Sequence, residues 1–139
     1  HLHKIVPGAA TERLVGYMQC EEIGAGEYII RQGEAADHLF FIESGQVTAQ
    51  LEPKGGTSMR LENMQGGRAV GELGFYLGTR RSAAVVADRP SVLYRLSQET
   101  LARIEQEDPE AAYAFHRAII HLLGERVLHL VKAVDALQS

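Results

Sequence analysis

The sequence predicts an α+β fold that is mainly β: a jelly-roll barrel with a short helix before it and two helices after it. Between Glu21 and Ser97, short β-prone runs alternate with glycine and proline, a pattern typical of short strands joined by tight turns. Regularly spaced short strands of this kind indicate a sandwich or jelly-roll barrel. The expected strands are Tyr28–Arg31, Leu39–Glu43, Gln46–Leu51, Met59–Asn63, Ala83–Ala87 and Val92–Leu96.

Helical segments are expected on both sides of the barrel. Residues 9–18 have the pattern of a short helix, which Gly16 weakens. Ser97 is a suitable N-cap for a first C-terminal helix, and Asp108 followed by Pro109 starts a second. We therefore interpret residues 1–139 as a single domain with an N-terminal helix (9–18), a β-roll (21–97) and C-terminal helices (98–137).

Length and composition are those of one ordinary globular domain. The chain has 139 residues, of which 45% are hydrophobic and 23% charged, and its net charge of −4 argues against a nucleic-acid partner. The single cysteine, Cys20, fits a reducing cytosolic setting, and no apolar run approaches the roughly 18 residues of a membrane span. Since the first residue is His1, we expect the chain to be a fragment of a larger protein.

One segment, Val70–Ala84, combines the groups needed to bind a small phosphorylated sugar. Gly71 lets the backbone bend, and a helical turn over residues 72–76 would offer unpaired N–H groups to a phosphate. Glu72 is an acceptor for sugar hydroxyls, whereas the planar fork of Arg81 matches two phosphate oxygens. Ser82 can add a hydroxyl donor. The alternative is a surface turn with an exposed Glu–Arg pair.

A second segment, Ile29–Val47, has two β-prone runs around a polar turn, and Gly33 and Gly45 mark sharp turns. Together the two segments resemble the signature motifs of the cyclic nucleotide-binding domain family, whose phosphate-binding cassette corresponds to the segment beginning at Gly71. The resemblance implies that Glu72 binds the ribose 2′-hydroxyl and Arg81 the cyclic phosphate. The predicted ligand-binding residues are Gly71, Glu72, Leu73, Gly74, Arg81, Ser82 and Ala83.

Two positions depart from the family pattern. Phe75 stands where a smaller aliphatic residue is usual, and we expect it to narrow the pocket. Arg80 replaces the proline that many members have before the key arginine. Neither change removes a group that contacts the ligand.

No catalytic or metal site is predicted. His121, Glu125 and His129 share a helical face, but a metal site needs more converging ligands. Ser82 lies beside Arg81, yet the sequence places no base near it. We therefore expect a binding module that is not an enzyme, with no cofactor apart from its regulatory ligand.

The last helix carries apolar residues at spacings of three and four. The simpler interpretation is a stripe that packs on the barrel. The alternative is that the half beyond Gly124 moves over the nucleotide, with Gly124 as a hinge, or pairs with a second copy as a homodimer. The stripe consists of Phe115, Ile119, Leu123, Val127, Leu130, Val134 and Leu137.

The nature of the nucleotide depends on this helix. Leu130, Val131 and Val134 would form an apolar lid without a hydrogen bond specific for guanine. Apolar packing discriminates weakly between bases, so we favour cAMP over cGMP.

From Glu21 onward, the chain also resembles the cytosolic C-terminal domains of some bacterial SulP-type sulfate permeases. This resemblance implies a sensor at the inner membrane that regulates an anion transporter. Two alternatives remain: a structural or oligomerisation module that ignores nucleotide, and the effector domain of a transcription regulator similar to the catabolite activator protein. The segments that carry the resemblance are Gly71–Gly78, Leu93–Ser97, Glu107–Glu110 and Phe115–Arg117.

Overall fold

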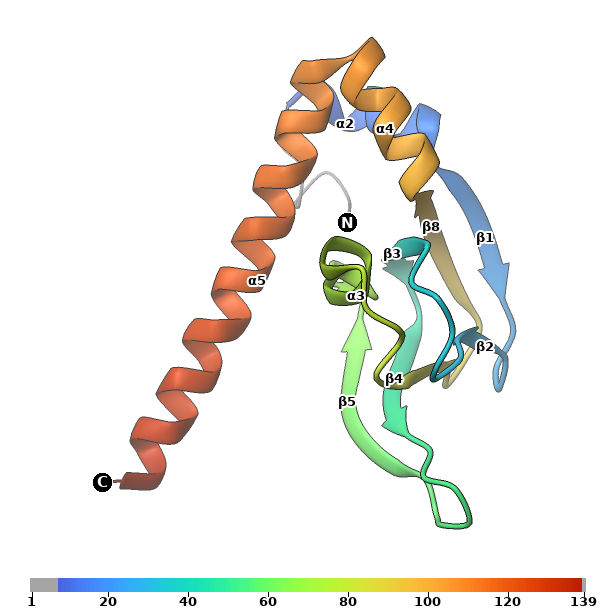
Figure 1. The fold of residues 1–139 in the computed structure, drawn as a ribbon, viewed down its shortest axis with the longest axis vertical. Helices are drawn as coiled ribbons and strands as arrows, with labels where there is room; N and C mark the ends of the chain where they lie inside the picture. Colours follow the sequence, from blue (N-terminus) through green and yellow to red (C-terminus); the bar gives the residue numbers. More distant parts are fainter. Residues whose placement is uncertain (1–7, 139) are drawn as a thin grey trace.

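The computed structural model describes residues 8–138 and confirms the mainly β fold with helices at both ends of the chain (Figure 1). The strands form two four-stranded antiparallel sheets, in the orders β1-β8-β3-β6 and β2-β7-β4-β5. The elements in chain order are α2 (Ala10–Tyr17), β1 (Gln19–Ile23), β2 (Tyr28–Ile30), β3 (His38–Ser44), β4 (Gln46–Leu51), β5 (Met59–Gln65), β6 (Ala69–Val70), α3 (Glu72–Leu77), β7 (Ala84–Ala87), β8 (Ser91–Ser97), α4 (Gln98–Glu107) and α5 (Pro109–Gln138).

Strand β3 lies between two hydrophobic cores. Successive side chains of a strand point to opposite faces. Leu39 and Phe41 accordingly pack under the helices, with Phe75 and Phe115, whereas Phe40 and Ile42 pack between the two sheets. This burial on both faces explains the continuous apolar run at residues 39–42.

Two strands were not expected from the sequence. β1 has the polar sequence Gln19–Ile23, which shows no apolar alternation, yet it pairs along its whole length with β8. β6 contains only two residues and pairs with β3. Both strands depend on a neighbouring strand to supply backbone partners, which local sequence does not reveal.

The expected helix starts and sharp turns are confirmed. The Ser97 hydroxyl accepts a hydrogen bond from the Thr100 amide (3.0 Å), and the Asp108 carboxylate accepts one from the Ala111 amide (3.2 Å). Gly33 and Gly45 both have positive φ. At Gly45 a Cβ would lie 2.6 Å from the Cα of Ser91, so only glycine allows this close approach.

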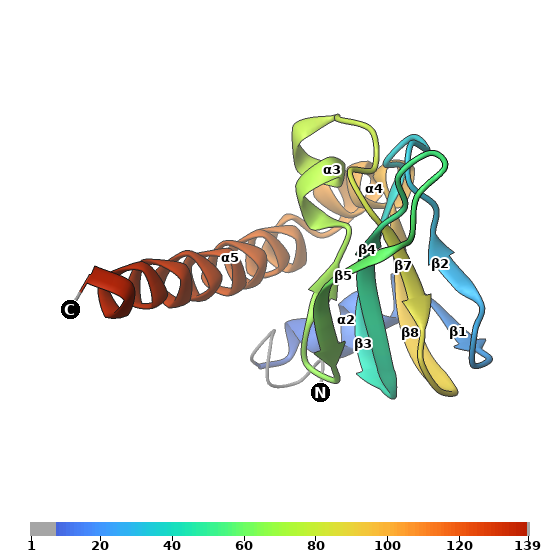
Figure 2. The same cartoon turned by 90° about the horizontal axis from the view of Figure 1, so that it is seen from below.

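Helix α5 packs on the body of the domain through its first half only. Phe115 and Ile119 are buried, but Val127, Leu130 and Val134 are each more than half exposed. The prediction of a stripe packed on the barrel is therefore wrong beyond Leu123. A 30-residue helix is about 45 Å long, and its distal half runs away from the sheets (Figures 1 and 2).

The helix continues through Gly124 without a break, and Gly124 as a hinge stays a prediction. Across the described residues, no helix has both the length and the apolar content to cross a membrane.

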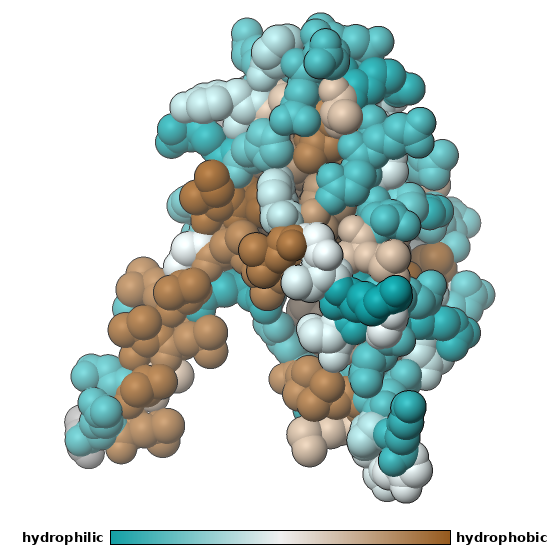
Figure 3. Space-filling model, viewed as in Figure 1, coloured by the Kyte–Doolittle hydropathy of each residue, from teal (hydrophilic) through white to brown (hydrophobic). Residues whose placement is uncertain are grey.

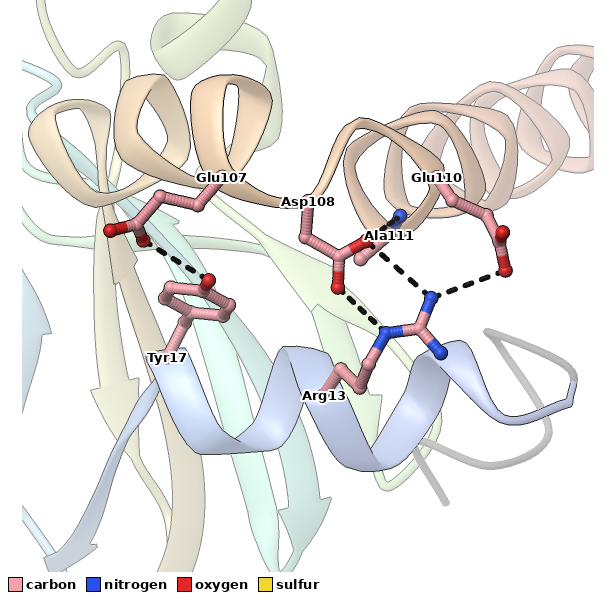
Figure 4. Close-up of polar contacts among 6 residues, drawn as sticks. All are labelled: Arg13, Tyr17, Glu107, Asp108, Glu110 and Ala111. Carbon is pink, nitrogen blue, oxygen red and sulfur yellow. Dashed lines mark hydrogen bonds and ion pairs between the residues drawn. The ribbon is translucent and has the colours of Figure 1, made fainter.

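Polar contacts fasten α2 to the corner between α4 and α5 (Figure 4). Arg13 donates to Asp108 (Nε to Oδ2, 2.6 Å) and to Glu110 (Nη2 to Oε1, 3.2 Å). The Tyr17 hydroxyl donates to Glu107 (3.1 Å). Hydrogen bonding to Arg13 holds the pKa of Asp108 below its ordinary value of 3.8.

Replacing Arg13 should destabilise the domain in a pH-dependent way. A carboxylate whose pKa is lower in the folded state stabilises the fold above its unfolded pKa, and this contribution disappears as the pH falls through the folded pKa. Denaturant unfolding should therefore show Arg13→Gln less stable than wild type near neutral pH, with a difference that shrinks below pH 3.8. Arg117→Gln is the control, because Arg117 donates to Tyr113 of its own helix. A difference that stays constant with pH would contradict this account.

Candidate functional site

The predicted ligand-binding residues all line one cavity. The cavity has a volume of about 230 Å³ and lies between α3 and the sheet that contains β4 and β7. Its lining includes all seven predicted residues: Gly71, Glu72, Leu73, Gly74, Arg81, Ser82 and Ala83. Apolar side chains of the sheet β2-β7-β4-β5 also line it, namely Ile30, Ala49, Leu61, Met64 and Val85. The cavity thus has a polar side on the cassette and an apolar side on the sheet.

The short helix α3 begins beside this cavity. Gly71 precedes it with φ of 79° and accepts the first helical hydrogen bond, from Phe75 (3.2 Å). A Cβ at Gly71 would lie 2.5 Å from Nη1 of Arg81, so the absence of a side chain lets the guanidinium approach.

Arg81 is buried and fixed by backbone carbonyls. Its Nη1 donates to the carbonyl of Gly71 (2.8 Å), and its Nη2 donates to the carbonyl of His38. None of the ion pairs among residues 8–138 includes Arg81, although it is only 8% exposed. Burial lowers its pKa, an effect that nearby carboxylates partly oppose. A buried cation without a paired anion favours binding of an anion.

Glu72 is also buried, and it is paired with a residue that the sequence did not reveal. The Glu72 carboxylate accepts a hydrogen bond from Nη1 of Arg126, which comes from α5. Nη2 of the same Arg126 reaches Glu62 on β5 at 3.3 Å. Arg126 is 54 residues from Glu72 in sequence, and only the path of α5 brings them together.

The expected apolar lid is not observed. Leu130, Val131 and Val134 are exposed and do not line the cavity, because α5 runs away from the sheets at these positions. Arg126 is the residue of α5 that lines it.

The two departures from the family pattern have separate outcomes. Phe75 does not narrow the cavity, since its ring is buried in the core under the helices. Arg80 is exposed and donates to the carbonyl of Gly33 (3.1 Å). Ser82 is exposed at the cavity.

Known proteins resemble this chain in both sequence and structure. The sequence profile of the cyclic nucleotide-binding domain matches residues 20–108. The cAMP-dependent protein kinase regulatory subunit of Blastocladiella emersonii is 32% identical over 130 residues, covering 91% of this chain and 32% of the relative. Glutaminase 1 of Bradyrhizobium diazoefficiens is 33% identical over 115 residues, which cover 83% of this chain and 18% of the glutaminase. The chain therefore spans a third or less of these relatives.

Solved structures share the fold. A cyclic nucleotide-binding domain from Methylobacillus flagellatus superposes with a TM-score of 0.85 at 22% identity, covering 97% of this chain and 81% of that one. The catabolite activator protein of Thermus thermophilus superposes with a TM-score of 0.76 at 23% identity. The superposition covers 99% of this chain and 62% of that protein's chain.

A methyl group at Gly71 should disturb the site. Gly71→Ala combines a positive φ with a contact of 2.5 Å to Arg81, whereas Gly78→Ala has a similar φ and no atom within 4 Å. We expect Gly71→Ala to lower the free energy of unfolding by about 1–3 kcal/mol more than Gly78→Ala, because overpacking adds to the backbone strain. Denaturant unfolding measures both. Equal losses would show that Arg81 moves aside without cost.

Proposed function

The chain belongs to the cyclic nucleotide-binding domain family, and we propose that it is a regulatory sensor whose cavity beside α3 binds cAMP. The observation that carries the proposal is the buried Arg81, which takes part in none of the ion pairs of residues 8–138 and lines the same cavity as the buried Glu72. A cyclic nucleotide has one anionic phosphate next to a ribose hydroxyl, which is the pair of groups that these two residues suit.

Each part of the nucleotide has a complementary group. The phosphate would take the free donors of Arg81, with Ser82 and the backbone at Leu73, Gly74 and Ala83 nearby. The 2′-hydroxyl would donate to Glu72. Since Arg81 is already held by two carbonyls, little ordering is needed when the phosphate binds.

The adenine base is favoured by the apolar wall and by one relative. Ile30, Leu61 and Val85 offer packing surface without a hydrogen bond specific for guanine. The relative from Blastocladiella emersonii, 32% identical over 130 residues, is cAMP-dependent by name.

We further propose that the domain is the cytosolic C-terminal part of a bacterial SulP-type sulfate permease at the inner membrane. The support is the resemblance of four sequence segments. Binding would regulate transport only if the nucleotide has different affinities for the two states of the transporter. The chain itself would carry no enzyme activity.

The fold shared with the Thermus thermophilus catabolite activator protein supports the alternative, an effector domain of a transcription regulator. A module that does not respond to nucleotide is the third candidate.

Substituting Arg81 tests the binding site. Arg81→Ala should weaken cAMP binding by about 2–5 kcal/mol, because a desolvated charge contact is lost. Arg80→Ala is the control and should cost far less, since Arg80 lines the same cavity but its guanidinium is exposed and bonds to the carbonyl of Gly33. Glu72→Gln should also weaken binding, and less so for 2′-deoxy-cAMP. Calorimetric titration measures all three, and equal losses in the two arginine variants would exclude this site.

Thermal unfolding identifies the ligand. Saturation at about 100 times Kd adds roughly 2.7 kcal/mol, or several degrees in a domain of this size. cAMP should raise Tm more than cGMP, with 5′-AMP as the control. If no nucleotide raises Tm, the favoured hypothesis becomes a structural module that does not respond to nucleotide.

The exposed stripe of α5 favours a homodimer. At the first position of each heptad stand the β-branched residues Ile120, Val127 and Val134, and at the fourth stand Leu123, Leu130 and Leu137. This pattern is that of a parallel two-stranded coiled coil. Most of these side chains are exposed, and they gather on the apolar face of the distal helix (Figure 3). A second copy of α5 would cover them.

Leu130→Glu should convert the dimer to a monomer, because it places a charge in the helix seam. His129→Glu is the control, since residue 129 lies outside the seam. Analytical ultracentrifugation measures the mass of each variant. A monomeric wild type at high concentration would exclude the homodimer.

A further inference from the structure

We propose that His38 is a positioning residue for Arg81, and that protonation of its imidazole weakens the binding of nucleotide in the cavity. The proposal rests on the nucleotide site proposed above. It assigns to that site a second regulator, the proton, which acts through a residue outside the cavity.

His38 contacts two arginines through two different groups. Its backbone carbonyl accepts a hydrogen bond from Nη2 of Arg81 and is one of the two carbonyls that hold this guanidinium. Its ring nitrogen Nε2 lies 2.9 Å from Nη2 of Arg95. The residue that fixes the buried cation is therefore itself fixed by a second arginine.

Arg95 lies on β8, between the strands β1 and β3. Its Nη1 pairs with Glu21 of β1 at 3.0 Å, and its Nη2 reaches the ring of His38 on β3. Its Nε is buried and has no hydrogen-bond partner among the described residues. The two Nη atoms therefore make the polar contacts of Arg95 within residues 8–138, and His38 accounts for one of them.

The contact with Arg95 requires a neutral imidazole. A guanidinium has donors only, so Nε2 of His38 must be the acceptor, and it accepts only when it carries no proton. Burial lowers the pKa of His38 below its ordinary value of 6.5, and the charge of Arg95 lowers it further. The imidazole is therefore neutral at neutral pH and becomes charged as the pH falls through this lowered pKa. Once charged, it offers Arg95 no acceptor and repels it.

The other charged groups around the imidazole do not supply this response. Histidine is the side chain whose ordinary pKa lies between pH 5 and 8. Burial raises the pKa of Tyr17 above 10.0, and the hydrogen bond to Glu52 does the same for Tyr28. The remaining charged groups that face His38 or line the two cavities beside it are Arg31, Arg81, Arg95 and Arg103, with the carboxylates Glu21, Glu34 and Asp37.

Protonation would loosen the site at its cation. Without the contact to Arg95, the first residue of β3 can shift, and the carbonyl that holds Arg81 shifts with it. The guanidinium must then be ordered when the phosphate binds, which lowers the affinity. A direct attraction between a protonated imidazole and the phosphate would strengthen binding in acid. The sign of the pH dependence therefore distinguishes positioning from direct contact.

Calorimetric titration with cAMP between about pH 7.5 and about pH 5 tests the proposal, because this range spans the protonation of a histidine. Wild type should lose affinity about threefold to tenfold as the pH falls below 6.5, as expected for one hydrogen bond. His38→Gln keeps an acceptor but takes up no proton, so this loss should disappear. His38→Leu has no acceptor and should bind at neutral pH as weakly as wild type does in acid. His129→Gln is the matched control and should keep the wild-type profile, since His129 is exposed and lines none of these cavities.

The guanidinium resonances of Arg81 in the ligand-free protein separate the positioning role from the nucleotide site. NMR identifies them by their loss in Arg81→Ala. They should shift or broaden below pH 6.5 in wild type and stay constant in His38→Gln. If they do so but no cyclic nucleotide binds at any pH, the positioning role stands and the proposed ligand is wrong.

Three results would overturn the proposal. The first is cAMP binding with the same pH dependence in wild type and in His38→Gln. The second is tighter binding of cAMP by wild type in acid. The third is a set of Arg81 resonances that do not respond to pH in wild type.

Discussion

The hydrogen bonds from Arg81 to the carbonyls of Gly71 and His38 fix the position of the buried cation in the candidate site. They join the end of the cassette to the start of α3 and to β3. These two bonds hold the guanidinium close to the start of α3. Because it lies so close, position 71 has no room for a side chain and must be glycine. None of the ion pairs in the described part of the chain includes Arg81, although it is buried and lines the cavity.

The same region connects the site to the rest of the domain. The ring of Phe75, on α3, packs in the core that also contains Phe41 of β3 and Phe115 of α5. The rings of Phe41 and Phe115 lie 5.9 Å apart in an edge-to-face arrangement. A displacement of α3 would therefore disturb the packing under the first half of α5. This apolar connection is separate from the polar contact that Arg126 makes with Glu72.

Helix α5 consequently has two parts with different physical roles. The first part is buried against α2 and α4, where Arg13 and Asp108 add polar contacts to the apolar packing. The second part exposes apolar side chains to solvent. Its contact with Glu72 is made by Arg126. An exposed apolar stripe on a long helix is unusual for a surface that faces only water, which is why a second copy of α5 is a reasonable occupant.

The sequence by itself determined the mainly β class, the helix starts at Ser97 and Asp108, and the grouping of the cassette residues around one site. These features follow from local rules, namely strand spacing, capping side chains and the chemistry of closely spaced residues. Arg126, the strand β1 and the exposure of distal α5 were decided only by the tertiary structure. The pairing of β1 depends on β8, the partner of Arg126 lies 54 residues away, and the stripe of α5 has the same periodicity whether or not a surface covers it. Helical periodicity identifies an apolar face, but only the path of the chain determines which part of that face is buried.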